Sequence, residues 1–263
     1  MPIKIQEHSP WRSQVLVTKA LLHREVITRF GKYKLGAIWI FVDPLLSVIV
    51  IGLLLGPWLG RSSGDIPYAF FVLCGFMLLS VLTGPLKAGM GAIKSNKGLL
   101  VFQKVQPLDP FIARFILQLL TNISAMTVFC IIACWFGMHI SLERIPEAVL
   151  CVILTWVLGS GLGLYAGIAA LKFNELEKVI EYGTRPLMFL SAVLYPTSAL
   201  PPEYMKYLLY NPLVHTIEYL RMTLFPGYIV DQVNLYYPAT WALVATTLGL
   251  MSYRNNRHFL LQQ

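Results

Sequence analysis

Long apolar stretches separated by short basic segments dominate the pattern of the chain. An α-helix needs about 20 apolar residues to cross a hydrocarbon core of about 30 Å. Five stretches meet or nearly meet this requirement, at residues 37–59, 67–86, 112–136, 148–171 and 236–253. A sixth stretch at 183–200 is short and contains Pro186 and Pro196, and we count it as a span because the loop charges require one there.

The distribution of basic residues predicts the orientation. Of the 21 Lys and Arg residues, sixteen fall in the N-terminal segment, in the segments after the second and fourth predicted spans, and in the C-terminal tail. The alternate loops hold four, and Arg114 stands at a predicted membrane edge. Because cytosolic loops are enriched in Lys and Arg, we expect six spans with both termini in the cytosol. No cleavable signal sequence is expected in the basic N-terminal segment.

The composition supports a single membrane-embedded domain over residues 1–263 and excludes other classes. Hydrophobic residues make up 56% and charged residues 13% of the chain, whereas soluble domains carry about 25% charged residues. An ordinary soluble enzyme, a disordered tail and a secreted disulfide scaffold are therefore excluded. The net charge of +8 follows from membrane topology, so no nucleic-acid partner is expected.

No convincing catalytic or metal-binding motif occurs in the sequence. The GxxxxGK[ST] pattern of ATP-binding loops is absent, as are HExxH and GxSxG, and the five histidines are scattered. We therefore expect an all-α membrane protein with no catalytic residue, metal or cofactor of its own. The glycines at 159, 163 and 167 share one helical face within a predicted span, and this spacing favours close helix packing over phosphate binding.

Two further segments are neither spans nor short loops. In residues 1–36, apolar positions recur at helical spacing between basic ones, which predicts an amphipathic helix on the cytosolic membrane surface. Alternatively, residues 1–36 form a solvated basic arm that does not lie on the membrane.

Residues 201–235 are rich in aromatic residues and divided by prolines. This pattern predicts two short helices, at about 202–210 and 212–224, that dip back into the membrane from outside.

Two segments expected in the cytosol are candidate contacts for a partner protein. Residues 93–107 place an apolar knuckle, 99–102, between lysines. Burial of such a knuckle in a groove of a partner gains about 25 cal/mol per Å². Alternatively, the knuckle rests on the lipid surface of the membrane. Residues 172–178 are the second candidate, although Glu175 and Lys178 can instead pair with each other on a solvated face.

Three blocks of the sequence resemble the permease subunits of type 2 ABC exporters, most closely the capsular polysaccharide exporters of Gram-negative bacteria. The blocks keep the family order and span essentially the whole chain. They are Arg29 to Gly36 with Trp39 and Asp43-Pro44, then Asn96 to Leu99 with Pro107 to Asp109, then Asn211 to His215 with Glu218, Arg221 and Pro226 to Tyr228. Asp43 stands where the family often has Glu, which keeps the charge.

The resemblance implies a homodimeric half-transporter in the bacterial inner membrane, with two copies of a separate ABC ATPase that binds ATP and Mg²⁺. It also implies a lipid-linked capsular polysaccharide as substrate, together with a periplasmic adaptor and an outer-membrane channel. Export of another cargo, such as O-antigen, a teichoic-acid-like polymer or a drug, stays open. An ion-coupled secondary transporter is less well supported, because Asp43 is the only acid within the predicted spans.

The candidate residues fall into three groups. The ATPase-coupling group comprises Asn96, Lys97, Gly98, Leu99, Phe102, Lys104, Glu175, Glu177 and Lys178. The substrate-path group comprises Tyr195, Tyr204, Tyr207, Tyr210, His215, Glu218, Arg221 and Tyr228. The gate group at the membrane surface comprises Arg29, Lys32, Lys34, Trp39 and Asp43. For Glu218 and Arg221, spaced i, i+3, a local ion pair is favoured over contact with the polymer.

Overall fold

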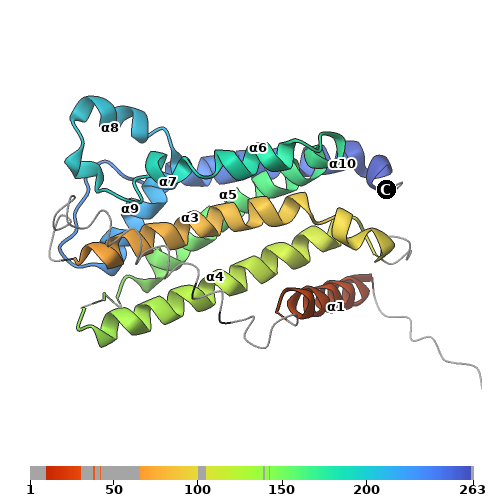
Figure 1. Ribbon diagram of the computed structural model, residues 1–263, viewed down its shortest axis with the longest axis horizontal. Helices are drawn as coiled ribbons and strands as arrows, with labels where there is room; N and C mark the ends of the chain where they lie inside the picture. Colours follow the sequence, from red (N-terminus) through yellow and green to blue (C-terminus); the bar gives the residue numbers. More distant parts are fainter. Residues whose placement is uncertain are drawn as a thin grey trace, which may run out of the picture.

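The computed structural model describes residues 10–30, 38, 42, 66–99, 105–138, 140–141 and 143–261. Within these ranges every regular element is helical and no strand occurs, which confirms the predicted all-α class. Four long helices lie side by side in a bundle (Figure 1). They are α3 (Tyr68–Met90), α4 (Asp109–Trp135), α5 (Ile145–Lys172) and α10 (Tyr236–Leu261).

Helices α3, α4 and α5 are long and apolar enough to cross a membrane. They correspond to the spans predicted at 67–86, 112–136 and 148–171. Helix α10 covers the stretch predicted at 236–253 and continues to Leu261. The span predicted at 37–59 lies outside the described residues, apart from Ile38 and Val42.

The segment predicted as one span at 183–200 does not form a continuous helix, so that prediction is corrected. It contains the end of α6 (Leu176–Gly183), the single turn α7 (Leu187–Leu190) and the 3-10 turn η2 (Thr197–Ala199). Pro186 and Pro196 supply no N–H to a helical ladder, and each proline ring clashes with the preceding turn. Between α7 and η2 the backbone of Ala192 adopts a positive φ of 53°, which a helix does not contain.

Two short helices follow at one end of the bundle, as the prolines predict. They are α8 (Pro202–Leu208) and α9 (Pro212–Leu224), and each has proline in its first turn, where the missing N–H costs nothing. Helix α9 packs against α3, α5 and α10, whereas α8 projects beyond the bundle (Figure 1). We call this the α8 end; the re-entrant depth of these helices stays a prediction.

Glycines allow α5 to lie against both of its neighbours. A β-carbon added at Gly159, Gly163 or Gly167 would lie 2.5 Å from a carbonyl oxygen of α3, that of Leu82, Pro85 or Gly89 respectively. On its other side, a β-carbon at Gly161 would lie 2.6 Å from the backbone of α10. Since real β-carbons do not approach backbone this closely, the predicted role of these glycines in close helix packing is confirmed.

The opposite end of the bundle holds α1 (Pro10–Phe30), the 3-10 helix η1 (Lys94–Leu99) and the end of α10 (Figure 1). We call this the α1 end. Helix α1 packs against α4, and Leu21 is buried there. The surface that α1 turns away from the bundle is partly apolar, with exposed Val15, Leu16, Val26 and Ile27. A helix in this segment is confirmed over Pro10–Phe30, and its amphipathic character and position on a membrane surface stay predictions.

Candidate functional site

At the α1 end, the carboxylate of Glu25 joins three elements. Glu25 Oε1 on α1 accepts hydrogen bonds from Arg114 Nε on α4 at 3.0 Å and from Asn96 Nδ2 on η1 at 3.2 Å. The side chains of Arg114 and Glu25 are 17% and 12% exposed. Charge-assisted bonds that are shielded from water are among the stronger polar contacts of a protein. The predicted coupling residue Asn96 is thus held by α1, a contact absent from the sequence-based predictions.

Further polar contacts attach α1 to the same elements. Arg24 donates to the carbonyl of Ser95 on η1 at 3.0 Å. Along α4, Arg29 donates to Gln118 at 2.9 Å, and Gln14 donates to Asp109. Arg29 is the one gate-group residue within the described ranges. The other gate residues, Lys32, Lys34, Trp39 and Asp43, lie outside them.

The two predicted coupling segments lie next to each other. Lys94 Nζ on η1 is 3.0 Å from Glu177 Oε1 on α6 and 3.3 Å from Asn174 Oδ1 before it. Glu175 and Lys178 are exposed and form no ion pair with each other. Lys97 and Gly98 are exposed, and Leu99 ends η1. Phe102 and Lys104 lie outside the described residues.

At the α8 end, the guanidinium of Arg221 is fully buried and bonded to backbone. Its NH1 atom donates to the carbonyl of Ala192 at 2.8 Å, and its NH2 atom donates to that of Val193 at 2.8 Å. A third carbonyl, that of Phe71 on α3, lies 3.2 Å from NH2. The Phe71 ring lies under the guanidinium, with its centroid 3.5 Å from Cζ. Arg221 therefore ties α9 to α3 and to the segment that follows α7.

The carboxylate of Glu218 balances this buried charge. Glu218 Oε1 lies 3.2 Å from Arg221 NH1, so the predicted local ion pair is confirmed. Tyr228 donates from its hydroxyl to Glu218 Oε2 at 2.6 Å, and the backbone N–H of Thr197 donates to Oε1 at 3.3 Å. Burial raises the pKa of Tyr228, and the nearby carboxylate of Glu218 raises it further, so the phenol remains the donor.

These contacts explain how the chain tolerates its break between α6 and α9. A helix that stops leaves carbonyl groups without intrahelical partners, and such groups are costly away from water. Side chains from distant elements supply the missing donors. The carbonyls of Leu190, Ala192, Val193 and Leu194 accept from Asn211, Arg221, Arg221 and Tyr68 respectively.

Several predicted substrate-path residues are thus enclosed by the chain itself. Glu218, Arg221, His215 and Tyr228 are all buried. His215 accepts from the backbone N–H of Asn234 on Nδ1 at 3.2 Å, so its Nε2 carries the proton and donates to the carbonyl of Leu209 at 2.9 Å. Burial lowers the pKa of His215, and the bond to Leu209 partly opposes this shift. In this conformation these side chains offer no open surface to a polymer.

The tyrosines of the same predicted group lie on the surface. Tyr204, Tyr207 and Tyr210 are 64%, 76% and 72% exposed. Tyr195 is half-buried and donates to the carbonyl of Phe189 at 2.6 Å. The predicted path group therefore divides into an enclosed set on and after α9 and an exposed aromatic set on and around α8.

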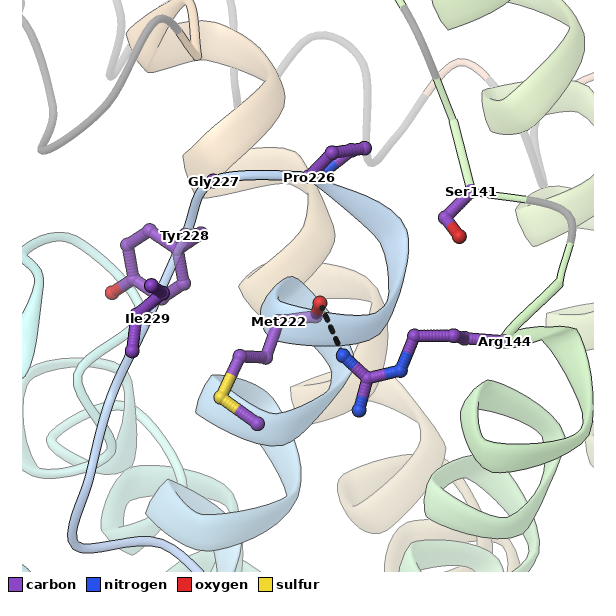
Figure 2. Close-up of a pocket in the computed structure, with 7 residues that line it drawn as sticks. All are labelled: Ser141, Arg144, Met222, Pro226, Gly227, Tyr228 and Ile229. Carbon is purple, nitrogen blue, oxygen red and sulfur yellow. Dashed lines mark hydrogen bonds between the residues drawn. The ribbon is translucent and has the colours of Figure 1, made fainter.

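A pocket of about 330 Å³ opens beside α9, between Arg144 and the Pro226-Gly227 turn (Figure 2). Arg144 reaches across it and donates to the carbonyl of Met222 at 3.3 Å (Figure 2). The same guanidinium pairs with Glu147 at 2.7 Å. The guanidinium of Arg144 therefore already has acceptors within the chain.

The site residues contain no grouping suited to metal binding within the described ranges. No set of three His, Cys, Asp or Glu side chains there is close enough to hold a metal ion. The described cysteines are free thiols, of which Cys74 and Cys151 are buried. The arrangement is one of joints between helices, at both ends of the bundle.

Comparison with known proteins assigns the family. The pattern of the ABC-2 type transporter family matches residues 17–225. The chain is 33% identical over 253 residues to the polysialic acid transport protein KpsM of Escherichia coli, a match that covers 96% of this chain and 98% of the relative. It is 30% identical over 253 residues to the capsule polysaccharide export inner-membrane protein CtrC of Neisseria meningitidis serogroup B, with 94% of each chain covered.

A third relative is similar over nearly the same length. The capsule polysaccharide export inner-membrane protein BexB of Haemophilus influenzae is 27% identical over 243 residues, which cover 91% of this chain and 90% of the relative. The family pattern extends over most of the chain, and α3, α4 and α5 are long and apolar enough to cross a membrane. This chain therefore belongs to the ABC-2 type transporter family of membrane proteins.

Proposed function

We propose that this chain is the permease half of an ATP-driven exporter that moves lipid-linked capsular polysaccharide across the bacterial inner membrane. The observation that carries the proposal is the similarity of the chain to a polysialic acid transport protein and to two capsule polysaccharide export inner-membrane proteins. This similarity extends over at least 90% of both chains in each of the three comparisons. Two copies form the conduit, and two copies of a separate ATPase supply the energy. A periplasmic adaptor and an outer-membrane channel complete the route.

The contacts at the α1 end support a coupling role for η1. Placed in the cytosol, η1 and the start of α6 form one surface, because Lys94 and Glu177 join them. An ATPase that moves this surface also pulls on Glu25, which holds both Asn96 and Arg114. Motion of the partner thereby reaches α1 and α4 together. ATP shifts the permease between states only through the different fit of the ATPase to each state.

The contacts at the α8 end support separate roles for its buried and its exposed side chains. The enclosed Glu218 and Arg221 hold the broken chain in place, and the exposed tyrosines of α8 face the exported polymer. Tyr204 and Tyr207 present flat apolar faces with polar edges, which suit contact with sugar rings. The chain itself performs no bond-breaking step in this scheme. ATP hydrolysis takes place on the partner subunit.

Deletion and complementation test this function directly. We expect deletion of the gene in its host to remove polysaccharide from the cell surface while polymer accumulates inside, and the wild-type chain to restore export. Loss of O-antigen or of drug resistance with the capsule intact would assign a different cargo. Unaided ATP hydrolysis by the purified chain would contradict the permease assignment.

Co-purification tests the coupling surface. The substitutions Leu99→Asp and Phe102→Asp place charge in the apolar knuckle, and we expect them to release the ATPase from the purified complex. Ile229→Asp introduces the same charge at an exposed apolar position of the α8 end, and the ATPase should stay bound. Retention of the ATPase by both knuckle variants would show that it docks elsewhere.

A further inference from the structure

A second pocket, of about 260 Å³, lies between α3 and the segment that joins α6 to α7. We call it the α3–α7 pocket. Its apolar wall is formed by Phe76, Leu79 and Met188. Two basic side chains, Lys87 and Arg185, come from opposite walls. The pocket thus combines an apolar body with a positively charged rim.

Lys87 and Arg185 have no acid to neutralise them in the described part of the chain. Both are exposed, and neither takes part in an ion pair there. The guanidinium of Arg185 lies 5.1 Å from the ring centroid of Tyr182, a contact that leaves its N–H groups available. Two unneutralised cations on one rim attract an anion more strongly than either does alone.

The hydroxyl groups of the pocket do not compete for this role. Ser80, Thr83 and Thr184 each donate to a carbonyl of their own helical turn, at 2.7, 3.0 and 2.8 Å respectively. The donors that remain for a ligand are therefore the ammonium of Lys87 and the guanidinium of Arg185. Such donors match the oxygens of a phosphate, for which Arg and Lys are the usual protein partners.

The position of the pocket along α3 selects a lipid over a soluble anion. Lys87 follows Tyr68 by about 28 Å at the rise of an α-helix, which is close to the thickness of a hydrocarbon core. The uncharged run of α3 ends directly before Lys87. When α3 spans the bilayer, the two cations therefore lie at headgroup level and the apolar wall lies beside the acyl chains.

We propose that the α3–α7 pocket binds the anionic phosphate headgroup of a membrane lipid, with Lys87 and Arg185 as its ligands. The phosphate belongs either to bulk phospholipid or to the lipid that anchors the exported polymer, and the second source rests on the proposed function. Basic residues at a membrane edge can also act only by setting the orientation of the protein in the membrane, without binding a specific lipid. The difference is that a binding site needs both cations at this pocket, whereas topology needs only charge at this end of the bundle.

Native mass spectrometry of the delipidated permease–ATPase complex tests the site. The probes are phosphatidylglycerol and a diacylglycerol with the same chains and no phosphate. We expect the wild-type protein to bind phosphatidylglycerol and not diacylglycerol. Lys87→Gln and Arg185→Gln should each weaken binding, and together by about tenfold. Lys87→Arg combined with Arg185→Lys keeps both charges and should keep most of the binding.

The matched control is the double substitution Arg254→Gln and Arg257→Gln, which removes two exposed cations from the α1 end without touching the pocket. Phosphatidylglycerol binding that is unchanged in Lys87→Gln and Arg185→Gln, or equally weakened in the control, would overturn the proposal. That result would leave the complementation test of export unaffected. Failure of the lipid-site proposal can therefore be distinguished from failure of the proposed export function.

Export in cells separates the two sources of phosphate. If the Lys87→Gln and Arg185→Gln variants lose phosphatidylglycerol in vitro and export normally, the pocket holds bulk phospholipid. If they also accumulate lipid-linked polymer inside the cell while the control exports normally, the pocket receives the lipid phosphate of the substrate. Both outcomes support a lipid-phosphate site and differ only in the identity of the lipid.

Discussion

Glu25 on α1 accepts a hydrogen bond from Arg114 on α4 at 3.0 Å, across 89 positions of sequence. The same oxygen of Glu25 also accepts from Asn96 on η1. One carboxylate thus holds a surface helix, a long bundle helix and the segment proposed to meet the ATPase. Movement of η1 must either carry α1 and α4 with it or break one of these bonds.

The substitution Glu25→Ala tests this joint. It leaves the largely buried Arg114 without its ion-pair partner, and a lost charge-assisted hydrogen bond of this kind costs about 2 kcal/mol. We expect lower thermal stability and faster hydrogen exchange in α1 and η1, together with ATPase activity that no longer drives export. Thermal unfolding, hydrogen exchange and surface polysaccharide measure the three effects.

Glu181→Ala is the matched control, because Glu181 is an exposed acid on a different helix, α6. It should leave stability and export unchanged. Glu25→Gln keeps an acceptor oxygen and should retain part of the coupling. Normal export by Glu25→Ala would show that the joint is structural only.

The sequence reveals those helices that their own residues specify. The first-turn prolines Pro202 and Pro212 place α8 and α9 correctly, because proline fits the first turn of a helix and is disfavoured in the turns that follow. The long apolar stretches predict α3, α4 and α5 to within a few residues. The glycine face of α5 predicts close packing, because only a small residue permits it.

The break after α6 could not be predicted, because its stability depends on residues far away. Whether the carbonyls of Ala192 and Val193 find donors is decided by Arg221, on a different helix. The distribution of Lys and Arg over the loops requires the chain to cross the membrane at 183–200. This distribution does not show whether one continuous helix makes the crossing. Glu25 could have been singled out from the sequence, because it is one of only two acids in the basic first 36 residues.

Gly163→Ala is expected to push α5 away from α3. The new β-carbon would lie 2.5 Å from the carbonyl oxygen of Pro85, and backbone at both sides cannot yield without moving a helix. Overpacking of this kind costs about 1–3 kcal/mol. Thermal unfolding of the purified protein in detergent measures the loss.

Gly183→Ala is the control for this substitution. Gly183 lies in the last turn of α6, and a β-carbon there meets no atom within 4 Å. Since alanine favours a helix over glycine by up to about 1 kcal/mol, the variant should be as stable as the wild type or slightly more so. Equal stability of Gly163→Ala and Gly183→Ala would contradict the close approach of α5 and α3.

Tyr228→Phe removes one hydroxyl from the enclosed cluster at the α8 end. Glu218 Oε2 then loses the 2.6 Å bond in a site without water access, and we expect a loss of about 2 kcal/mol in unfolding free energy. Tyr236→Phe removes the same group from a residue that is 86% exposed and should have no measurable effect. Denaturant titration compares the two variants, and a neutral Tyr228→Phe would mean that Glu218 finds another donor.

Replacement of the exposed tyrosines tests the proposed aromatic path. Tyr204→Ala and Tyr207→Ala remove ring faces that are each worth about 1 kcal/mol in a stacked contact, which predicts a severalfold loss of surface polysaccharide. The ATPase should still co-purify, because these residues lie at the opposite end of the bundle from η1 (Figure 1). Pro201→Ala alters the same surface without removing an aromatic ring and should export normally. Unchanged export by the double tyrosine variant would exclude the path.

Exchange of the Lys94–Glu177 pair separates its effect on stability from its effect on transport. Because the two side chains are 42% and 39% exposed, the pair contributes less than about 1 kcal/mol to folding. Lys94→Glu sets two acids against each other and should lower export without lowering thermal stability measurably, and Glu177→Lys in the same chain should restore export by reversing the pair. Lys206→Glu, an exposed charge reversal on α8, should leave ATPase-coupled export intact. If the double exchange exports no better than Lys94→Glu alone, then η1 and α6 do not act as one surface, and the ATPase must engage them separately.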